Sequence, residues 1–235
     1  MKLALIGHGA MGKLVEARAV SEGHEVSRVI TSSDAARGVE ALAEMLRGHD
    51  AAIDFSVAHA VRANVEASVR AHVPLVEGTT GWNSELDEVR AIVNQQKGAL
   101  IYGANFSIGV NLFYRVVAQA AELFTAVGGY EPFVEEAHHS RKRDSPSGTA
   151  IKLRDIVAAQ TKGDISVAST RAGHIAGTHR VGFDSLADQV LLTHTARSRE
   201  GFAAGALLAA NWITGKRGVY EFTDAIDEIL KERKV

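Results

Sequence analysis

The chain has 235 residues, of which 46% are apolar and 23% charged, as in soluble globular proteins with a sizeable core. The length suits two small domains better than one. The absence of cysteine excludes disulfides, thiolate metal sites, iron–sulfur clusters and a cysteine nucleophile, and a net charge of −2 gives no basic field for nucleic acid. No apolar run reaches the roughly 18–20 residues that span a membrane. We therefore expect neither nucleic acid nor a membrane as a partner.

The first part of the chain, to about residue 105, alternates short apolar runs with helical patterns. Nearly continuous apolar strands separated by helices of about ten residues are typical of a parallel sheet that is covered on both faces. The predicted strands are Leu3–Ile6, Glu25–Ile30, Ala51–Phe55, Pro74–Val76 and Ala99–Tyr102, and the predicted helices are Met11–Ser21, Val39–Arg47, His59–Ala71 and Ser84–Gln96.

The pattern changes after residue 105, because strands now follow strands. Ser107 is the expected N-cap of a long helix to about Thr125. Successive strands predict a mixed or antiparallel sheet with helices packed against it. The predicted strands are Glu131–Ala137, Ile165–Arg171, Thr178–Phe183 and Gln189–His194, and further helices are predicted over Thr149–Gln160, Phe202–Thr214 and Tyr220–Arg233.

The expected fold class is therefore α/β, with a Rossmann-type doubly wound parallel sheet and a smaller α+β domain. We assign residues 1–105 and the returning segment 217–235 to the first domain, which would bind a dinucleotide. Residues 106–216 form the second domain, which would bind substrate and support oligomerisation.

The first chemical motif is the glycine-rich run Gly7-His8-Gly9-Ala10-Met11-Gly12, which follows the first strand and opens the first helix. Glycine permits the tight turn and close approach to a pyrophosphate, and the helix N-terminus attracts phosphate. This context favours dinucleotide binding over a purely structural turn.

The end of the second strand bears on the choice between NADH and NADPH. An NAD-preferring fold usually has Asp or Glu there to hold the ribose 2′-OH. Here the run is Thr31-Ser32-Ser33, with Asp34 expected beyond the turn, and Arg28 or Arg37 within reach of a 2′-phosphate. We expect NADPH to be used at least as well as NADH, unless this loop is solvated and never touches the cofactor.

The densest chemistry lies between Glu136 and Ala150. His138 and His139 are followed by Arg141, Lys142 and Arg143, and then Ser147-Gly148-Thr149 opens a helix. Such a block suits a substrate with carboxylates: a histidine can donate a proton, a lysine can stabilise developing charge, and the helix N-terminus can bind an anion. The structural alternative is an exposed basic loop followed by an ordinary helix cap. A metal site is less favoured, since no third ligand has suitable spacing to the histidines.

The sequence resembles the dihydrodipicolinate reductase family. The Glu136–Ala150 block matches the family pattern E-x-H-H-x-x-K-x-D-x-P-S-G-T-A at every specified position. Further similar segments run along nearly the whole chain: the glycine-rich run, Asp54-Phe55-Ser56, Gly78-Thr79-Thr80-Gly81, Ala104–Val110, Arg171–His179, His194–Arg199 and Phe202–Ala206.

The resemblance implies NADH- or NADPH-dependent reduction of 4-hydroxy-tetrahydrodipicolinate, a cyclic dicarboxylate, to tetrahydrodipicolinate and water in diaminopimelate and lysine biosynthesis. It implies His138 as proton donor or acceptor, Lys142 as its catalytic partner, His139 as a substrate contact, and Gly148 and Thr149 as carboxylate ligands. It assigns cofactor binding to Gly7, His8, Gly9, Ala10, Met11 and Gly12, to Gly78, Thr79 and Thr80, and to Gly103, Ala104, Asn105 and Phe106. No metal is implied.

Two departures from the family concern the cofactor: the glycine turn is often one residue longer, and the acidic residue after the second strand is missing. The resemblance also implies a cytoplasmic homotetramer joined through the sheets of the second domain. Two alternatives stay open: another two-domain Rossmann dehydrogenase acting on an amino acid or semialdehyde, and a non-catalytic dinucleotide sensor. The first leaves the His-His-Lys block unexplained, and the second lacks a visible output module.

Overall fold

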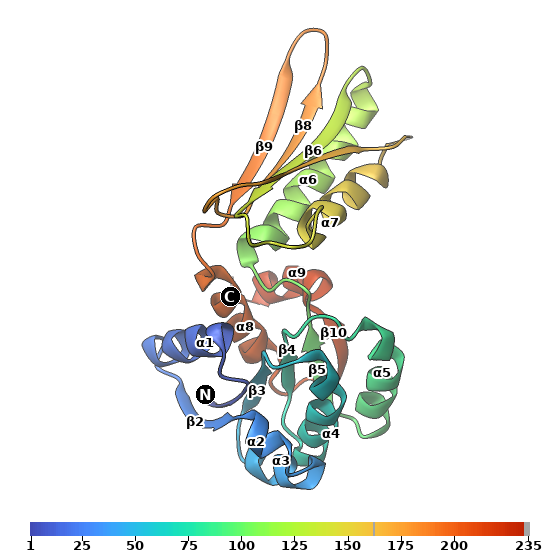
Figure 1. Cartoon of the computed structure of the whole chain (residues 1–235). Helices are drawn as coiled ribbons and strands as arrows, with labels where there is room; N and C mark the ends of the chain where they lie inside the picture. The colour runs from blue at the N-terminus through green and yellow to red at the C-terminus, as the bar shows by residue number, and fades with distance from the viewer. Residues whose placement is uncertain (162, 233–235) are drawn as a thin grey trace. The chain divides into compact units, whose positions relative to one another are not determined.

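A computed structural model describes residues 1–161 and 163–232 and divides the chain into two compact units. Unit 1 contains Met1–Ser107 and the chain from Arg199 onward, and unit 2 contains Ile108–Ser198 (Figure 1).

Unit 1 is built on a six-stranded sheet of order β10-β5-β4-β3-β1-β2, in which every neighbouring pair is parallel. The order reverses at β1, and ligands of open α/β sheets bind at such a reversal, outside the carboxyl ends of the strands. The strands are β1 (Lys2–Ile6), β2 (Glu25–Ile30), β3 (Ala51–Asp54), β4 (Leu75–Glu77), β5 (Ala99–Tyr102) and β10 (Gly218–Glu221). The α-helices are α1 (Ala10–Ser21), α2 (Ser32–Ala35), α3 (Val39–Leu46), α4 (Val61–Ala71), α5 (Leu86–Gln95), α8 (Glu200–Ile213) and α9 (Phe222–Glu232).

The central strands of this sheet are buried on both faces, as their continuous apolar runs predict. All four residues of β3 and four of the five in β1 are buried. One core cluster includes Ile6, Leu42, Val65, Val89 and Leu100, from strands and from helices α3, α4 and α5. The predicted doubly wound parallel sheet is confirmed.

Unit 2 is a four-stranded mixed sheet of order β7-β6-β8-β9 with two helices packed on it (Figure 1). Strand β6 pairs in parallel with β7 and antiparallel with β8, and β8 pairs antiparallel with β9. Val134 and Val181 lie in one cluster with Val117 of α6 and Leu153 of α7. The elements are α6 (Ile108–Val127), β6 (Glu131–His138), α7 (Gly148–Ala158), β7 (Ser166–Arg171), β8 (Thr178–Asp184) and β9 (Gln189–Thr195).

Two expectations about the C-terminal part need correction. The chain returns to unit 1 at Arg199 and not at 217, because the apolar helix α8 packs against α1, β3, β4 and β5. In addition, Gly218–Glu221 forms strand β10 beside β5, where the sequence predicted that a helix begins at Tyr220. The predicted end of that helix, Arg233, lies outside the described residues.

No helix among the described residues is both long and apolar enough to cross a bilayer.

Candidate functional site

In unit 1 the predicted cofactor residues follow strands β1, β4 and β5, which lie in one sheet with β3 between β1 and β4. Ile6, Asp54, Glu77 and Tyr102 are paired in one row across β1, β3, β4 and β5. The segments that begin at Gly7, Phe55, Gly78 and Gly103 therefore leave the same edge side by side. The structure thus brings together the three sets of residues that were predicted to bind the cofactor.

The glycine turn is held closed by contacts that require glycine. Gly7 has φ +85°, and a Cβ there would lie 2.7 Å from the carbonyl oxygen of Phe55. A Cβ on Gly12 would overlap the carbonyl oxygen of Gly7. These two glycines are thus explained by the packing of the turn on its own helix and on β3.

Gly9 differs, because nothing in unit 1 requires glycine there. Its dihedral angles, φ −75° and ψ −160°, suit any residue, and a Cβ would meet no atom within 4 Å. It is the cap of α1, whose first turn carries no acidic residue. A bare helix start with open space in front of it fits the pyrophosphate of a dinucleotide. His8 at the same turn is exposed, with Nε2 2.7 Å from Glu16 Oε2.

The other two cofactor segments are fixed by aromatic rings. A Cβ on Gly78 would overlap the Phe55 ring, and the Phe106 ring lies edge-on to Phe55 at 6.3 Å between centroids. Phe106 is buried against Phe222 of α9, with ring centroids 4.6 Å apart. Thr80 and Ala104 are exposed, whereas Gly103 is buried beneath them.

The position of Asp34 corrects one expectation. It does not lie beyond the turn: its Oδ2 accepts hydrogen bonds from the backbone N–H of Thr31, 2.9 Å away, and from the Thr31 hydroxyl, 2.8 Å away. These bonds, together with the charges of Arg37 and Arg28, lower the pKa of Asp34. An ionised carboxylate therefore lies in α2, shortly after the end of β2, where the charges of Arg37 and Arg28 act on it.

In unit 2 the predicted acid–base residue lies at the end of β6. Glu136 and His138 are two positions apart on this strand, so their side chains share the face that packs on the helices. Both residues are buried, and His138 Nδ1 lies 2.7 Å from Glu136 Oε2. His138 Nδ1 thus faces the carboxylate, and Nε2 is the nitrogen that faces Gly177.

Glu136 is the centre of a network that also holds the start of α7. Its Oε1 accepts from Arg171 Nη2 at 2.6 Å, from the Ser147 backbone N–H at 3.0 Å and from the Ser169 hydroxyl at 2.8 Å. Burial alone would raise the pKa of Glu136, but these hydrogen bonds outweigh it and lower the pKa to about 2. The carboxylate is therefore ionised throughout the physiological range.

The two histidines of this network are kept neutral near pH 7. Burial lowers the pKa of His138, the charge of Glu136 raises it, and the charges of Lys142 and Arg171 lower it further. Burial and the neighbouring His138 lower the pKa of His179 to about 4. Because its pKa is lowered, protonated His138 is a stronger acid than an ordinary histidine and releases its proton readily.

The remaining predicted residues of unit 2 surround this network. Lys142 is partly buried and pairs with Asp144, Nζ to Oδ1 2.9 Å, and His139 directly follows His138. Ser147 caps α7 by accepting from the Ala150 N–H at 3.2 Å. Gly148 is exposed in the first turn, where a Cβ would meet no atom within 4 Å, and the Thr149 hydroxyl bonds to Tyr114. The open helix start is thus available to an anion.

Glu136, His138 and His179 also form the one group of potential metal ligands among residues 1–161 and 163–232. The group does not fit a cation. One oxygen of Glu136 is already paired with Arg171 and the other with His138, and the guanidinium would repel a metal ion.

The residues of the network that the sequence analysis did not single out include Glu136, Arg171 and His179. Glu136 has a recognisable signal, because the E-x-H spacing on a strand places both side chains on one face. Arg171 and His179 have none, since they reach Glu136 only through the pairing of β7 and β8 with β6.

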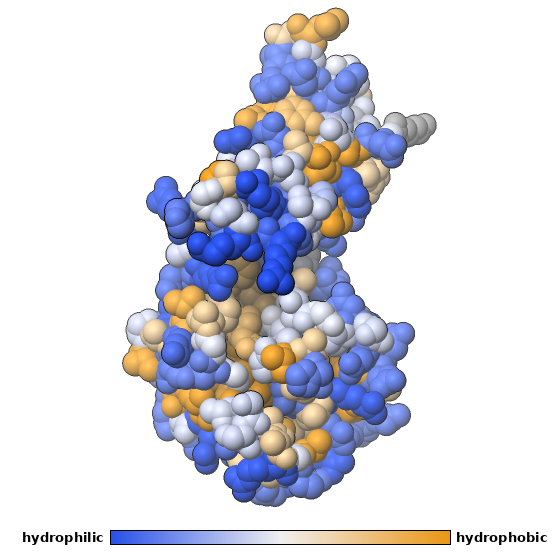
Figure 2. Space-filling model, in the orientation of Figure 1, coloured by the Kyte–Doolittle hydropathy of each residue, from blue (hydrophilic) through white to orange (hydrophobic). Residues whose placement is uncertain are grey.

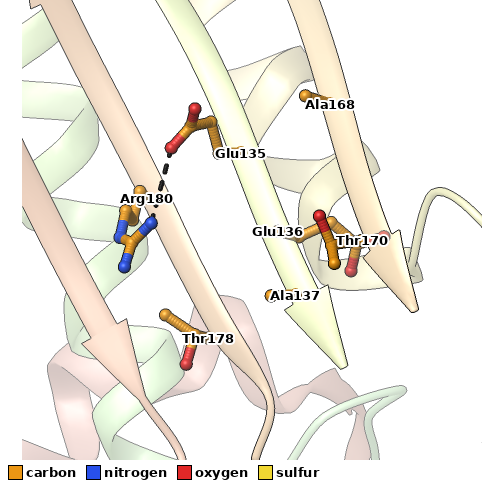
Figure 3. A pocket seen from close by; sticks show the side chains of 7 residues that line it. All are labelled: Glu135, Glu136, Ala137, Ala168, Thr170, Thr178 and Arg180. Carbon is orange, nitrogen blue, oxygen red and sulfur yellow. Dashed lines mark ion pairs between the residues drawn. The ribbon is translucent and has the colours of Figure 1, made fainter. Parts of the chain in front are cut away.

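The opposite face of this sheet carries a separate shallow hollow of about 130 Å³. Figure 3 shows Glu135 and Arg180 paired across β6 and β8, with Oε2 and Nη1 3.6 Å apart, and Thr170 and Thr178 on the flanking strands. Glu136 also lines it, but His138 and the start of α7 do not, so it is not the candidate active site.

Comparisons with known proteins find two family models that together cover most of the chain. A family model described as dihydrodipicolinate reductase, N-terminus, matches residues 1–106, and the corresponding C-terminus model matches residues 109–226. The 4-hydroxy-tetrahydrodipicolinate reductase of Christiangramia forsetii is 34% identical over 98% of this chain and 100% of its own length. The enzyme of the same name from Archaeoglobus fulgidus is 34% identical over 97% and 100%.

A similar fold is found in dipicolinate-bound dihydrodipicolinate reductase from Paenisporosarcina sp. TG-14. The TM-score is 0.78 with 20% identity, over 94% of this chain and 97% of the other. With both halves matched by family models and full-length relatives at 34% identity, the chain belongs to the dihydrodipicolinate reductase family, NAD(P)H-dependent oxidoreductases of lysine and diaminopimelate biosynthesis.

Proposed function

We propose that this chain reduces 4-hydroxy-tetrahydrodipicolinate, with unit 1 binding NADH or NADPH and unit 2 binding the cyclic dicarboxylate. The observation that carries the proposal is the buried Glu136–His138 pair, which shares its carboxylate with the N-terminus of an anion-binding helix. The Glu136 side chain contacts both the acid–base residue His138 and the helix start that would bind a carboxylate. This arrangement suits a dicarboxylate substrate that gains a proton during the reaction.

The cofactor would supply a hydride when bound, the substrate loses its hydroxyl group as water, and the protein supplies the proton and the charge stabilisation. His138 donates a proton to the reacting substrate, while Glu136 fixes the orientation of its ring and stabilises the imidazolium before the transfer. Lys142 places a cation near the negative charge that the hydride brings. His139 contacts the substrate, and the N–H groups of Gly148 and Thr149 bind a carboxylate.

Two glycine substitutions separate the cofactor site from the substrate site. Gly9→Ala and Gly148→Ala each add one methyl group that meets no protein atom, so both variants should keep the wild-type melting temperature. The Gly9 methyl group occupies the space assigned to pyrophosphate, and we expect NADPH affinity to fall about tenfold or more. Gly148→Ala should leave NADPH affinity unchanged and raise the substrate KM.

Calorimetric NADPH titrations and steady-state kinetics on both variants test this assignment, and each variant controls for the other. Wild-type NADPH affinity in Gly9→Ala would contradict the cofactor site. A cofactor defect in Gly148→Ala would contradict the placement of substrate at α7.

Asp34 is proposed to set the balance between the two cofactors. Its carboxylate can accept from a ribose 2′-OH, while Arg28 and Arg37 beside it can pair with a 2′-phosphate. Asp34→Asn keeps an acceptor for Thr31 and removes the negative charge, so the ratio of kcat/KM for NADPH to that for NADH should rise about tenfold. An unchanged ratio, measured with both cofactors, would show that this loop does not touch the ribose.

We also propose a cytoplasmic homotetramer joined through the open faces of the unit 2 sheets. On β9, Leu191 is 45% exposed, and Leu186 is fully exposed in the β8–β9 turn, where Figure 2 shows apolar atoms at the tip of the hairpin. Exposed leucines on a sheet and in its hairpin turn are typical of a protein–protein interface. Light scattering in solution measures the assembled mass directly.

A further inference from the structure

Two carboxyl groups outside the proposed acid–base network are completely buried in unit 1. Asp54 ends β3 and Glu77 ends β4, they are paired in the sheet register, and both side chains are 0% exposed. The register places the two carboxyl groups side by side at the ends of neighbouring strands, and each shifts the pKa of the other. Two ionised carboxylates this close in a dry interior would repel strongly, so one of them must hold a proton.

The hydrogen bonds around the pair show which carboxyl holds it. Asp54 Oδ1 accepts from the Ser56 backbone N–H at 2.8 Å, and Oδ2 accepts from Asn64 Nδ2 at 2.7 Å. Glu77 Oε1 accepts from the Thr79 backbone N–H at 2.7 Å, but its Oε2 is buried and receives no hydrogen bond from any described residue. The unsatisfied oxygen is the natural carrier of the proton.

We propose that Glu77 is protonated and donates a hydrogen bond to Asp54, and that this carboxyl pair is the positioning device for the loops that hold the nicotinamide end of the cofactor. The role of the loops rests on the proposed function, whereas the shared proton does not.

The pair is connected to all the segments at this edge of the sheet. The Ser56 N–H also donates to the Thr79 hydroxyl at 3.1 Å, which ties the loop after β3 to the loop after β4. The Gly78 N–H donates to the Asp54 carbonyl at 2.9 Å, and the Gly103 N–H donates to the Glu77 carbonyl at 3.1 Å. Loss of the shared proton would therefore push apart the ends of β3 and β4 and displace both loops.

No charge on the neighbouring elements compensates for ionisation of the pair. The side chains that contact it, from Ser56, Asn64 and Thr79, are neutral, and its register neighbours are Ile6 of β1 and Tyr102 of β5. The cations of α4 pair elsewhere: Arg62 with Glu88, and Arg70 with Glu40 and Glu66. Helix α8, which packs on β3 and β4, has Glu200 as its one charged residue, and Arg90 of α5 donates to the Tyr102 hydroxyl at 3.0 Å.

Burial and the charge of Asp54 both raise the pKa of Glu77 well above its ordinary value. A carboxyl whose pKa is raised on folding keeps its proton as the pH rises past 4.5, and the folded state loses stability as the pH approaches the raised value. The ordered loops should therefore weaken on the alkaline side.

The test uses Glu77→Gln and Asp54→Asn across pH 6–9, with Glu44→Gln on the exposed face of α3 as the control for loss of one charge. The amide introduced by Glu77→Gln donates permanently to Asp54, so this variant should bind NADPH like wild type at pH 6. At pH 9 it should bind about tenfold more tightly than wild type. Asp54 accepts from the Ser56 N–H through one oxygen and from Asn64 Nδ2 through the other, so the NH2 group of Asp54→Asn must face one of these two donors, and the variant should bind weakly at every pH. Glu44→Gln should follow wild type.

A second measurement needs no cofactor. Trp82 is buried, and its Nε1 donates to the Thr79 carbonyl at 2.8 Å, so its fluorescence reports on this loop. In a Trp212→Phe background, the Trp82 emission should shift to the red between pH 6 and 9, and the added Glu77→Gln substitution should abolish the shift.

The outcomes are distinct. Parallel pH profiles of wild type and Glu77→Gln in the Trp82 emission would overturn the proposal, and an alkaline-resistant Asp54→Asn would overturn the assignment of the proton to Glu77. Absence of NADPH binding at every pH in wild type would contradict the proposed function instead, and the Trp82 emission would still decide the shared proton. If Glu77→Gln abolishes the Trp82 shift but the NADPH affinity of wild type does not change with pH, the positioning role would be overturned.

Discussion

His138→Ala and Lys142→Ala are each expected to lower kcat by about two orders of magnitude or more, with little change in NADPH affinity. A general acid typically contributes 10²–10⁴-fold and a strong electrostatic donor about 10²–10³-fold. Both side chains act on charge that changes during the reaction, so their removal lowers kcat and does not merely raise KM. The pyrophosphate would lie at the glycine turn of unit 1, which neither substitution touches.

His139→Ala provides the contrast within the same motif. Its proposed role is contact with the substrate, so its loss should be mainly in KM. Steady-state kinetics on the three variants, with circular dichroism to confirm folding, distinguish these roles. An exposed basic loop without catalytic function predicts near-normal kcat for all three, and wild-type turnover in His138→Ala would contradict the proposed mechanism.

Much of the fold can be predicted from the local spacing of apolar residues in the sequence. The strands of unit 1 are apolar on both faces, so their runs predict both the strands and the parallel sheet. The exceptions are elements whose structure depends on partners distant in the sequence. Strand β10 is only half-buried and forms because β5 offers a free edge, and α8 belongs to unit 1 because its apolar surface covers that sheet.

The residues of the candidate site form the same two groups: those that local sequence predicts, and those that depend on partners distant in the sequence. Residues within one motif, such as His138, Lys142 and Gly148, could be proposed from their chemical types and spacing. Arg171 and His179 could not, because β7 and β8 bring them to Glu136 across more than 30 positions of sequence. The position of Asp34 follows from a capping box with Thr31, and the Thr31-x-x-Asp34 spacing is a sequence signal that could have predicted it. The two alternatives left open by the sequence, another dehydrogenase and a sensor, are set aside by the family assignment.

The second large effect is expected at Glu136, whose ionised carboxylate serves His138 and Arg171 at once. Glu136→Gln keeps an amide oxygen for the Ser147 N–H but removes the charge that raises the pKa of His138. The charges of Lys142 and Arg171, which lower that pKa, are then opposed only by the smaller effect of Asp144. Because the proposed step needs protonated His138, kcat falls as the pH rises through its pKa. The fall should begin at lower pH in the variant, and kcat at pH 7 should drop about tenfold to a hundredfold.

The matched control is Glu135→Gln. Glu135 is the adjacent residue of β6 on the opposite face of the sheet and pairs with Arg180, so this variant should leave the kcat–pH profile unchanged.

The pH dependence of stability supplies an independent readout. Folding lowers the pKa of Glu136 from 4.5 to about 2, so its ion pairs stabilise the protein above pH 4.5, and this contribution is lost as the pH falls toward 2. The difference in unfolding free energy between wild type and Glu136→Gln should shrink over that window. A kcat profile that stays in place or moves to higher pH would show that Glu136 does not tune His138, even where the stability difference follows the expected course.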